Sequence, residues 1–182
     1  MKELSLNILD ITENSIKAGA KHIAVTLDQV GNLLTFSVVD DGCGMKEDFA
    51  KSVIDPFCTT RTTSKVCMGI PLLKLAAEQT GGKLSLCSRH IEEHPQNHGT
   101  EITATFYTDH IDCAPLGDIV ATVKTLIQCN PDIDFIFRHT VNGKEVQLDT
   151  AELRSVLGDV PLDTYEVIKW IEDSLNEQYA LL

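Results

Sequence analysis

The apolar positions of residues 1–109 alternate between helical and strand spacing. Residues 3–18 have two apolar stripes on either side of one polar stripe, which predicts an amphipathic helix. Gly19 follows this stretch as a natural C-cap. Later stretches have apolar residues at every second position, as half-buried strands do. The predicted elements are a helix (3–18), a hairpin (22–29 and 33–39), two helices (47–54 and 70–80) and two strands (83–89 and 100–108).

The pattern changes after about residue 109. It then predicts a helix over 115–130, a hairpin within 133–150, and two further helices over 151–157 and 164–179. The Asn142-Gly143 dipeptide favours a type I′ turn in this hairpin. We therefore divide the chain into a first domain, residues 1–109, and a small C-terminal α+β appendage, residues 110–182. A unit of about 70 residues is marginally stable alone, so we expect it to pack on the first domain.

Composition narrows the function classes. The chain has 182 residues, is 43% hydrophobic and carries a formal net charge of −12. This charge argues against binding to nucleic acid or to an anionic membrane surface, both of which need clustered Lys and Arg. We expect no transmembrane helix and no signal peptide, because no apolar run has the required length. The six cysteines lack CxxC spacing, which indicates reduced thiols in the cytoplasm.

Two groups of polar residues are candidates for chemistry. Asp10 and Asn14 are four positions apart on the predicted helix, so their oxygens share one face. Such oxygens suit a hard cation or an activated water, although a solvated helix face has the same pattern. Asp40 ends a predicted strand and is followed by Gly42 and Gly44. Glycines let the backbone approach a flat ring closely, but a tight turn would explain them equally well.

A third group follows the Thr-rich segment. Gly69 opens the helix predicted over residues 70–80, and free N–H groups at a helix start bind phosphate. Arg61 and Lys65 precede it in the same segment. Each of the three groups is weak evidence alone, but their order along the chain is specific.

In that order the chain resembles the GHKL ATPases, which include gyrase, a heat-shock chaperone, histidine kinases and mismatch-repair ATPases. Three stretches carry the resemblance: ENSIKAGAKHIAVTL, VVDDGCGM and DPFCTTRTTSKVCMGIPLLKLAAEQTGG, similar to the N, G1 and G2 boxes. The resemblance covers roughly residues 4–108. It implies the Bergerat fold, an α/β (α+β) two-layer sandwich with a mixed, mostly antiparallel sheet, helices on one face, and ATP between helices and lid.

The resemblance assigns roles to single residues. It implies that Asn14 ligates magnesium and that Asp40 binds adenine. Gly42 and Gly44 match the G1 glycines, and Gly69 matches the last G2 glycine beside the phosphates. ATP and Mg²⁺ are therefore the expected cofactors.

The chain departs from the family at two places. Asp10 stands where the gyrase and mismatch-repair branch has its catalytic Glu, so we take Asp10 as the candidate base although it is one methylene shorter. Two expected lid glycines are Lys65 and Cys67. We infer that Arg61 and Lys65 contact phosphate from the lid. Glu13 points away from the side of Asn14, and we do not assign it as the base.

These features leave two functions open. The first is an ATP-binding regulator or energy module for a protein partner, which hydrolyses ATP slowly or transfers a phosphoryl group to a Ser or Thr. The second is a non-catalytic nucleotide-sensing scaffold with a degenerate lid. The whole chain also resembles, more loosely, small ATP-binding proteins encoded beside iron-only hydrogenases. A homodimer is left open.

Two further motifs have two readings each. Three histidines are spaced by four, namely His90, His94 and His98. On a helix they would form a metal-binding stripe, but Pro95 and Gly99 favour a solvated loop instead. Three cysteines lie in or near the G1 and G2 boxes, namely Cys43, Cys58 and Cys67. They are either a redox switch or inert small residues.

Overall fold

The computed structural model of the chain describes residues 3–54 and 69–182. Its strands are β1 (His22–Val30), β2 (Leu33–Asp40), β3 (Leu84–Arg89), β4 (Gly99–Tyr107), β5 (Asp134–Val141) and β6 (Lys144–Asp149). Its helices are α1 (Leu4–Lys17), α2 (Glu47–Val53), α3 (Gly69–Gln79), α4 (Ile119–Cys129), α5 (Thr150–Leu157) and α6 (Tyr165–Ala180).

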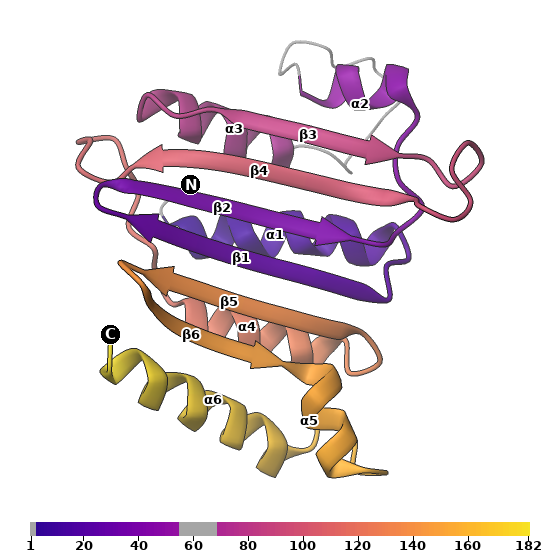
Figure 1. Ribbon diagram of the computed structural model, residues 1–182, viewed down its shortest axis with the longest axis vertical. Helices are drawn as coiled ribbons and strands as arrows, with labels where there is room; N and C mark the ends of the chain where they lie inside the picture. The colour runs from indigo at the N-terminus through magenta and orange to yellow at the C-terminus, as the bar shows by residue number, and fades with distance from the viewer. Residues whose placement is uncertain (1–2, 55–68) are drawn as a thin grey trace.

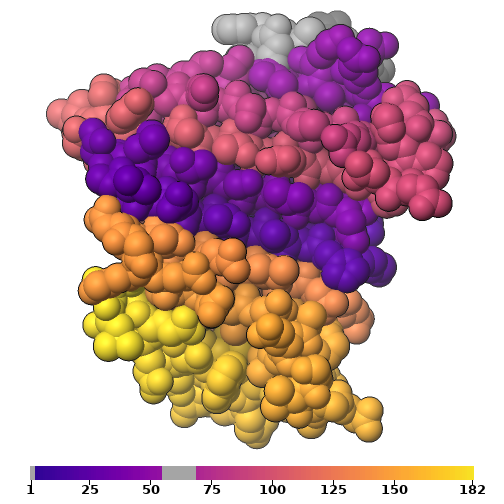
Figure 2. All heavy atoms as spheres, viewed as in Figure 1, coloured from indigo at the N-terminus to yellow at the C-terminus, as the bar shows by residue number. Residues whose placement is uncertain are grey.

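The strands form one six-stranded sheet in the order β3-β4-β2-β1-β5-β6. All neighbouring strands are antiparallel except β1 and β5, which are parallel. In Figure 1 the helices α1, α3 and α4 lie behind the sheet, and α6 lies beyond the β6 edge. The strands reach the surface as successive bands on the opposite face (Figure 2). The predicted fold class, a mixed and mostly antiparallel sheet with helices, is confirmed.

Helix α1 packs on the sheet through its apolar stripe. Leu4, Ile8 and Ile11 are each at most 4% exposed, as their helical spacing predicts. The first N–H groups of a helix need partners from outside it. Those of Leu4 and Ser5 donate to the carbonyl oxygens of residues 115 and 116, at 2.9 and 2.8 Å. The segment before α4 thus holds the start of α1.

The C-terminal segment continues the same sheet. Strand β5 pairs with β1 over the whole of β5, and β6 forms the edge. The turn between them has positive φ at Asn142 (47°) and Gly143 (87°), as the type I′ prediction requires. The expected packing on the first part is observed, while the division of the chain at residue 109 stays a prediction.

Helix α4 begins later than the sequence pattern predicts, at Ile119 rather than near residue 115. Gly117 has a φ of 77°, which a helix cannot accommodate. Asp118 then caps the helix, because its side chain accepts a hydrogen bond from the Ala121 N–H at 2.9 Å.

Candidate functional site

Two adjacent carboxylates end β2, and they face different partners. The hydroxyl of Ser15 on α1 donates to Asp40 Oδ2 at 2.6 Å. The N–H groups of Gly42 and Thr100 donate to Asp40 Oδ1, at 2.9 and 3.3 Å. Asp40 thus links α1 to the end of β2 and to β4. It is the residue predicted to bind adenine.

Asp41 instead holds the start of β1. Its Oδ1 accepts from the N–H groups of Lys21 and His22, and its Oδ2 lies 2.7 Å from His22 Nδ1. Burial raises the pKa of Asp41, but the bonds from His22 and Lys21 outweigh burial and lower it overall. The bond between the Asp41 carboxylate and the His22 ring raises the pKa of His22. His22 also lies 3.6 Å from Asp134, which pairs with Arg154 at 3.1 Å. A line of charged side chains therefore connects the end of β2 with the C-terminal segment.

The Gly loop, residues 40–44, has glycine where the backbone passes close to its neighbours. A Cβ on Gly42 would lie 2.9 Å from the Ala18 Cβ and 3.0 Å from Asp40 Oδ1. Gly44 has a φ of 67°, and a Cβ there would overlap the carbonyl of Arg89. Both glycines are thus required by packing, whether or not a ligand is bound.

The loop between β3 and β4 supports the Gly loop. The N–H of Ile91 donates to the carbonyl of Cys43 at 2.9 Å. His98 Nδ1 donates to the carbonyl of Gly42 at 2.7 Å. Sequence reasoning missed this role of His98, because no local signal links residues so far apart. Residues 3–54 and 69–182 contain no cluster of three metal-ligating side chains.

The second part of the site lies where α3 begins beside α1. A Cβ on Gly69 would lie 3.4 Å from the Asp10 Cβ and 3.8 Å from Asn14 Nδ2. The structure therefore brings these three predicted residues together. Burial raises the pKa of Asp10, the charge of Glu13 raises it further, and Lys17 opposes both. Glu13 itself pairs with Lys17 at 3.2 Å.

The polar stripe of α1 includes a residue that was given no role from sequence. Asn7 is 2% exposed, and among the described residues its Oδ1 has no hydrogen-bond partner. It lies about one helical turn before Asp10. The predicted lid residues Arg61 and Lys65, with Cys58 and Cys67, lie outside the described residues, so their roles stay predictions.

A mixed sheet with α1 on one face and the Gly loop at the end of β2 is the class of fold that the three sequence boxes predicted, a GHKL ATPase domain. A family model described as "Histidine kinase-, DNA gyrase B-, and HSP90-like ATPase" matches residues 2–110. The chain belongs to this family, and the family prediction is confirmed.

One curated protein that is similar to this chain is a DNA repair protein. A DNA mismatch repair protein MutL of Rhizorhabdus wittichii is 33% identical over 69 residues, which are 38% of this chain and 11% of that protein. The chain thus spans only a small part of the length of this curated relative.

Solved structures show the same fold. An Aquifex aeolicus MutL ATPase domain complexed with ADP has a TM-score of 0.57 at 15% identity, covering 86% of this chain and 69% of that one. The N-terminal domain of a DNA repair protein has a TM-score of 0.60 at 16% identity, covering 87% of this chain and 58% of that one. Both likenesses extend beyond residue 110, so they include part of the C-terminal segment. Within the described residues no helix is long and apolar enough to cross a membrane.

Proposed function

We propose that this protein binds Mg-ATP between α1, the Gly loop and the start of α3, and acts in the cytoplasm as a regulator or energy module for a partner protein. The observation that carries the proposal is the Asp40 carboxylate, fixed by three donors at the end of β2. ADP bound to the similar Aquifex aeolicus ATPase domain supports it.

The adenine end follows from the bonds of Asp40. A carboxylate oxygen accepts two hydrogen bonds. Oδ1 is saturated by the N–H groups of Gly42 and Thr100, whereas among residues 3–54 and 69–182 Oδ2 accepts only from Ser15. Oδ2 therefore has one lone pair for the exocyclic amino group of adenine. Guanine carries a carbonyl at this position and would be repelled.

The phosphate end follows from the residues near Gly69. The first N–H groups of α3 favour phosphate oxygens. The carboxamide oxygen of Asn14 is a hard ligand on this face of α1 and fits a magnesium ion. When bound, this ion would neutralise charge on the phosphates. Asp10, whose pKa is raised, would accept the proton of an attacking water or of a partner's Ser or Thr hydroxyl.

A second candidate is a nucleotide-sensing scaffold without turnover. The shorter side chain of Asp10 favours it, because Asp reaches less far from α1 than the Glu expected here. In this case nucleotide binding would be retained while hydrolysis and transfer would be absent.

Calorimetric titration with Mg-ATP tests binding, with Asp40→Asn beside the wild type. The new amide would keep its oxygen toward Gly42 and Thr100 and turn its NH₂ toward Ser15 and adenine. Losing one charge-assisted bond weakens binding by about 10- to 100-fold. Asp41→Asn is the matched control, since within the described part of the chain the Asp41 carboxylate bonds only to Lys21 and His22. Equal affinity of wild type and Asp40→Asn would refute the adenine assignment.

Turnover separates the two candidates. For an ATPase or kinase, Asp10→Asn lowers phosphate release or transfer by about 10²-fold or more, as expected for loss of a general base, and leaves Mg-ATP binding within a few-fold. Unchanged turnover in Asp10→Asn would exclude Asp10 as the base. Absence of turnover in the wild type with intact binding would support the scaffold.

A further inference from the structure

The loop between β3 and β4, residues 90–98, holds the Gly loop through hydrogen bonds to its backbone. The carbonyl of Gly42 accepts from His98 Nδ1 at 2.7 Å, and the carbonyl of Cys43 accepts from the Ile91 N–H at 2.9 Å. The second bond joins two backbone groups, so a substitution does not remove it. The first depends on the ring of His98, and in the described part of the chain no other side chain of this loop bonds to the Gly loop.

Gly42 is bonded on both sides of its Cα. Its N–H donates to Asp40 Oδ1 at 2.9 Å, and its carbonyl accepts from His98. Glycine has no Cβ to limit its backbone dihedrals, so these two bonds help to set the direction of the N–H. The second donor to Asp40 Oδ1 is the N–H of Thr100, at 3.3 Å. His98 is therefore linked to both N–H groups that hold Oδ1, to one through its side chain and to the other through the backbone.

The bonds to Oδ1 bear on the other oxygen of the same carboxylate. While two donors occupy Oδ1, Oδ2 keeps its lone pair for the amino group of adenine. If Oδ1 lost a donor, the carboxylate could rotate about its Cβ–Cγ bond and direct its lone pairs elsewhere. A group that is already in place binds its ligand without the cost of being ordered.

We propose that His98 is a positioning residue for adenine. Its ring fixes Gly42, Gly42 fixes the Asp40 carboxylate, and this carboxylate selects the amino group of the base. The inference rests on the proposed function, because it deepens the adenine assignment of that site. It also sets the protonation of the ring: a carbonyl oxygen only accepts, so Nδ1 of His98 carries a proton.

Two substitutions of similar size separate the hydrogen bond from the bulk of the ring. In His98→Asn the amide nitrogen is attached to Cγ, as Nδ1 is in histidine, so it can donate to Gly42 from the same position. His98→Leu has the same branching at Cγ but no donor. We expect His98→Leu to bind Mg-ATP about 3- to 10-fold more weakly, as for the loss of one hydrogen bond, and His98→Asn to bind within about twofold of the wild type.

The preference between two nucleotides separates positioning from a loss of stability. Mg-ITP is the comparison ligand in calorimetric titrations, because hypoxanthine has a carbonyl where adenine has its amino group. A variant that is partly unfolded loses affinity for both nucleotides by the same factor. A misplaced Asp40 carboxylate weakens Mg-ATP far more than Mg-ITP. The ratio of the two affinities should therefore fall about 3- to 10-fold in His98→Leu and stay near the wild-type ratio in His98→Asn.

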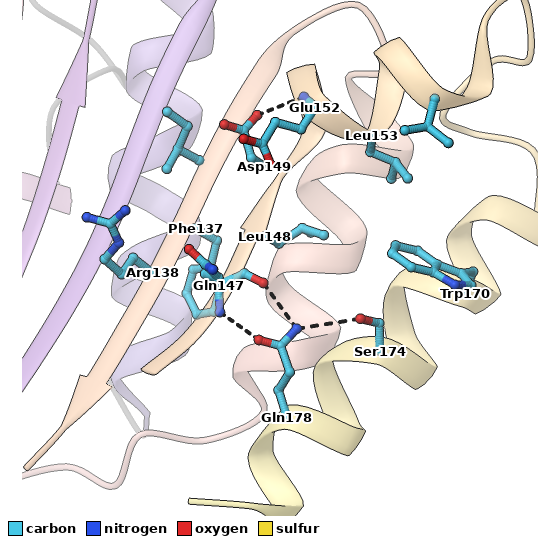
Figure 3. Close-up of a pocket in the computed structure, with 12 residues that line it drawn as sticks. Phe137, Arg138, Gln147, Leu148, Asp149, Glu152, Leu153, Trp170, Ser174 and Gln178 are labelled. Atoms are coloured by element: carbon cyan, nitrogen blue, oxygen red, sulfur yellow. Dashed lines mark hydrogen bonds between the residues drawn. The ribbon is translucent and has the colours of Figure 1, made fainter. Parts of the chain in front are cut away.

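Two control variants remove side chains that have no link to Asp40. His94→Leu changes an exposed histidine of the same loop. Gln178→Leu removes another side chain that bonds to the backbone, because Gln178 Oε1 accepts from the Gln147 N–H at 2.9 Å and its Nε2 donates to the Gln147 carbonyl at 3.1 Å (Figure 3). Strands β1 and β5 lie between this bond on β6 and the end of β2. Both controls should keep the wild-type affinity for Mg-ATP and the wild-type ratio.

The hydrogen bond can also be observed without nucleotide. A nitrogen–proton correlation NMR spectrum of the histidine rings, assigned with His98→Leu, should show a proton on Nδ1 of His98. Nδ1 without a proton would overturn the proposal. So would an unchanged ratio of affinities in His98→Leu, or equal losses in His98→Leu and His98→Asn.

The wild type distinguishes this inference from the proposed function. A wild-type protein that binds no Mg-ATP would refute the proposed function and this inference with it. Binding of Mg-ATP that is lost in Asp40→Asn but is the same in His98→Leu would support the adenine site and refute the role of His98 alone.

Discussion

The close approach of the Gly loop to the end of α1 leads to a quantitative prediction. In Gly42→Ala the new methyl group would lie 2.9 Å from the Ala18 Cβ and 3.1 Å from the Ala18 carbonyl oxygen. Both contacts are shorter than van der Waals separation, and both partners belong to a helix end that cannot move freely. Overpacking of this kind costs about 1–3 kcal/mol. The new methyl group would also press on Asp40 Oδ1, at 3.0 Å.

A double-mutant cycle with Ala18→Gly tests the geometry. Removing the Ala18 Cβ relieves the shorter contact but leaves the carbonyl, so we expect the double variant to recover part of the loss. The expected coupling free energy is about 1 kcal/mol, equal to about 3 °C in Tm. Urea unfolding of the four proteins measures it.

Gly69→Ala is the control for this cycle. Against the described residues a Cβ at Gly69 makes only ordinary contacts, the nearest being 3.4 Å from the Asp10 Cβ. Its unfolding free energy should therefore change by less than about 1 kcal/mol. Additive effects of Gly42→Ala and Ala18→Gly would refute the reasoning, because they would show that the two residues do not press on each other.

Two further predictions concern the C-terminal segment. Arg154 donates to Asp134 and to two backbone carbonyls, so Arg154→Ala should lower the free energy of unfolding by about 1–3 kcal/mol in urea titrations. Arg138→Ala is the control, because it loses only an exposed ion pair with Glu145, and it should lower the free energy of unfolding by less than about 1 kcal/mol. Burial lowers the pKa of His139 from 6.5, so the unfolded chain binds a proton that the folded chain does not. The neutral, buried His139 therefore contributes stability that should be lost as the pH falls below about 6.5. Urea midpoints measured at a series of pH values should depend less on pH in His139→Gln than in the wild type. Equal loss in the two arginine variants, or the same pH dependence with and without His139, would contradict these assignments.

The sequence predicted the local elements well, because each has a local cause. The two stripes of α1 and the Asn142-Gly143 turn depend on residues within a few positions of one another. The pairing of β1 with β5 joins His22 to Asp134, and parallel pairing has no turn signature that a local pattern can reveal. The sequence therefore indicated that the C-terminal segment packs on the first part, but not that it extends the sheet.

The candidate site divides in the same way. Asp10 and Asn14 share a helix face by spacing alone, so their proximity was predictable. The partners of Asp40 could not be predicted, because Ser15 and Thr100 reach it from α1 and β4 through the tertiary fold. The roles of Asp10, Asn14 and Asp40 toward nucleotide stay predictions until titration tests them.

The parallel pairing of β1 with β5 also bears on how the chain folds. The partners of β1 on this side lie far along the chain, so forming this pair requires closing a long loop, which slows folding. During synthesis the segment that matches the family model, residues 2–110, emerges before β5. Until β5 arrives, one side of β1 has unpaired backbone groups and can pair with another nascent chain. The C-terminal hairpin therefore also shields β1 from aggregation once it has docked.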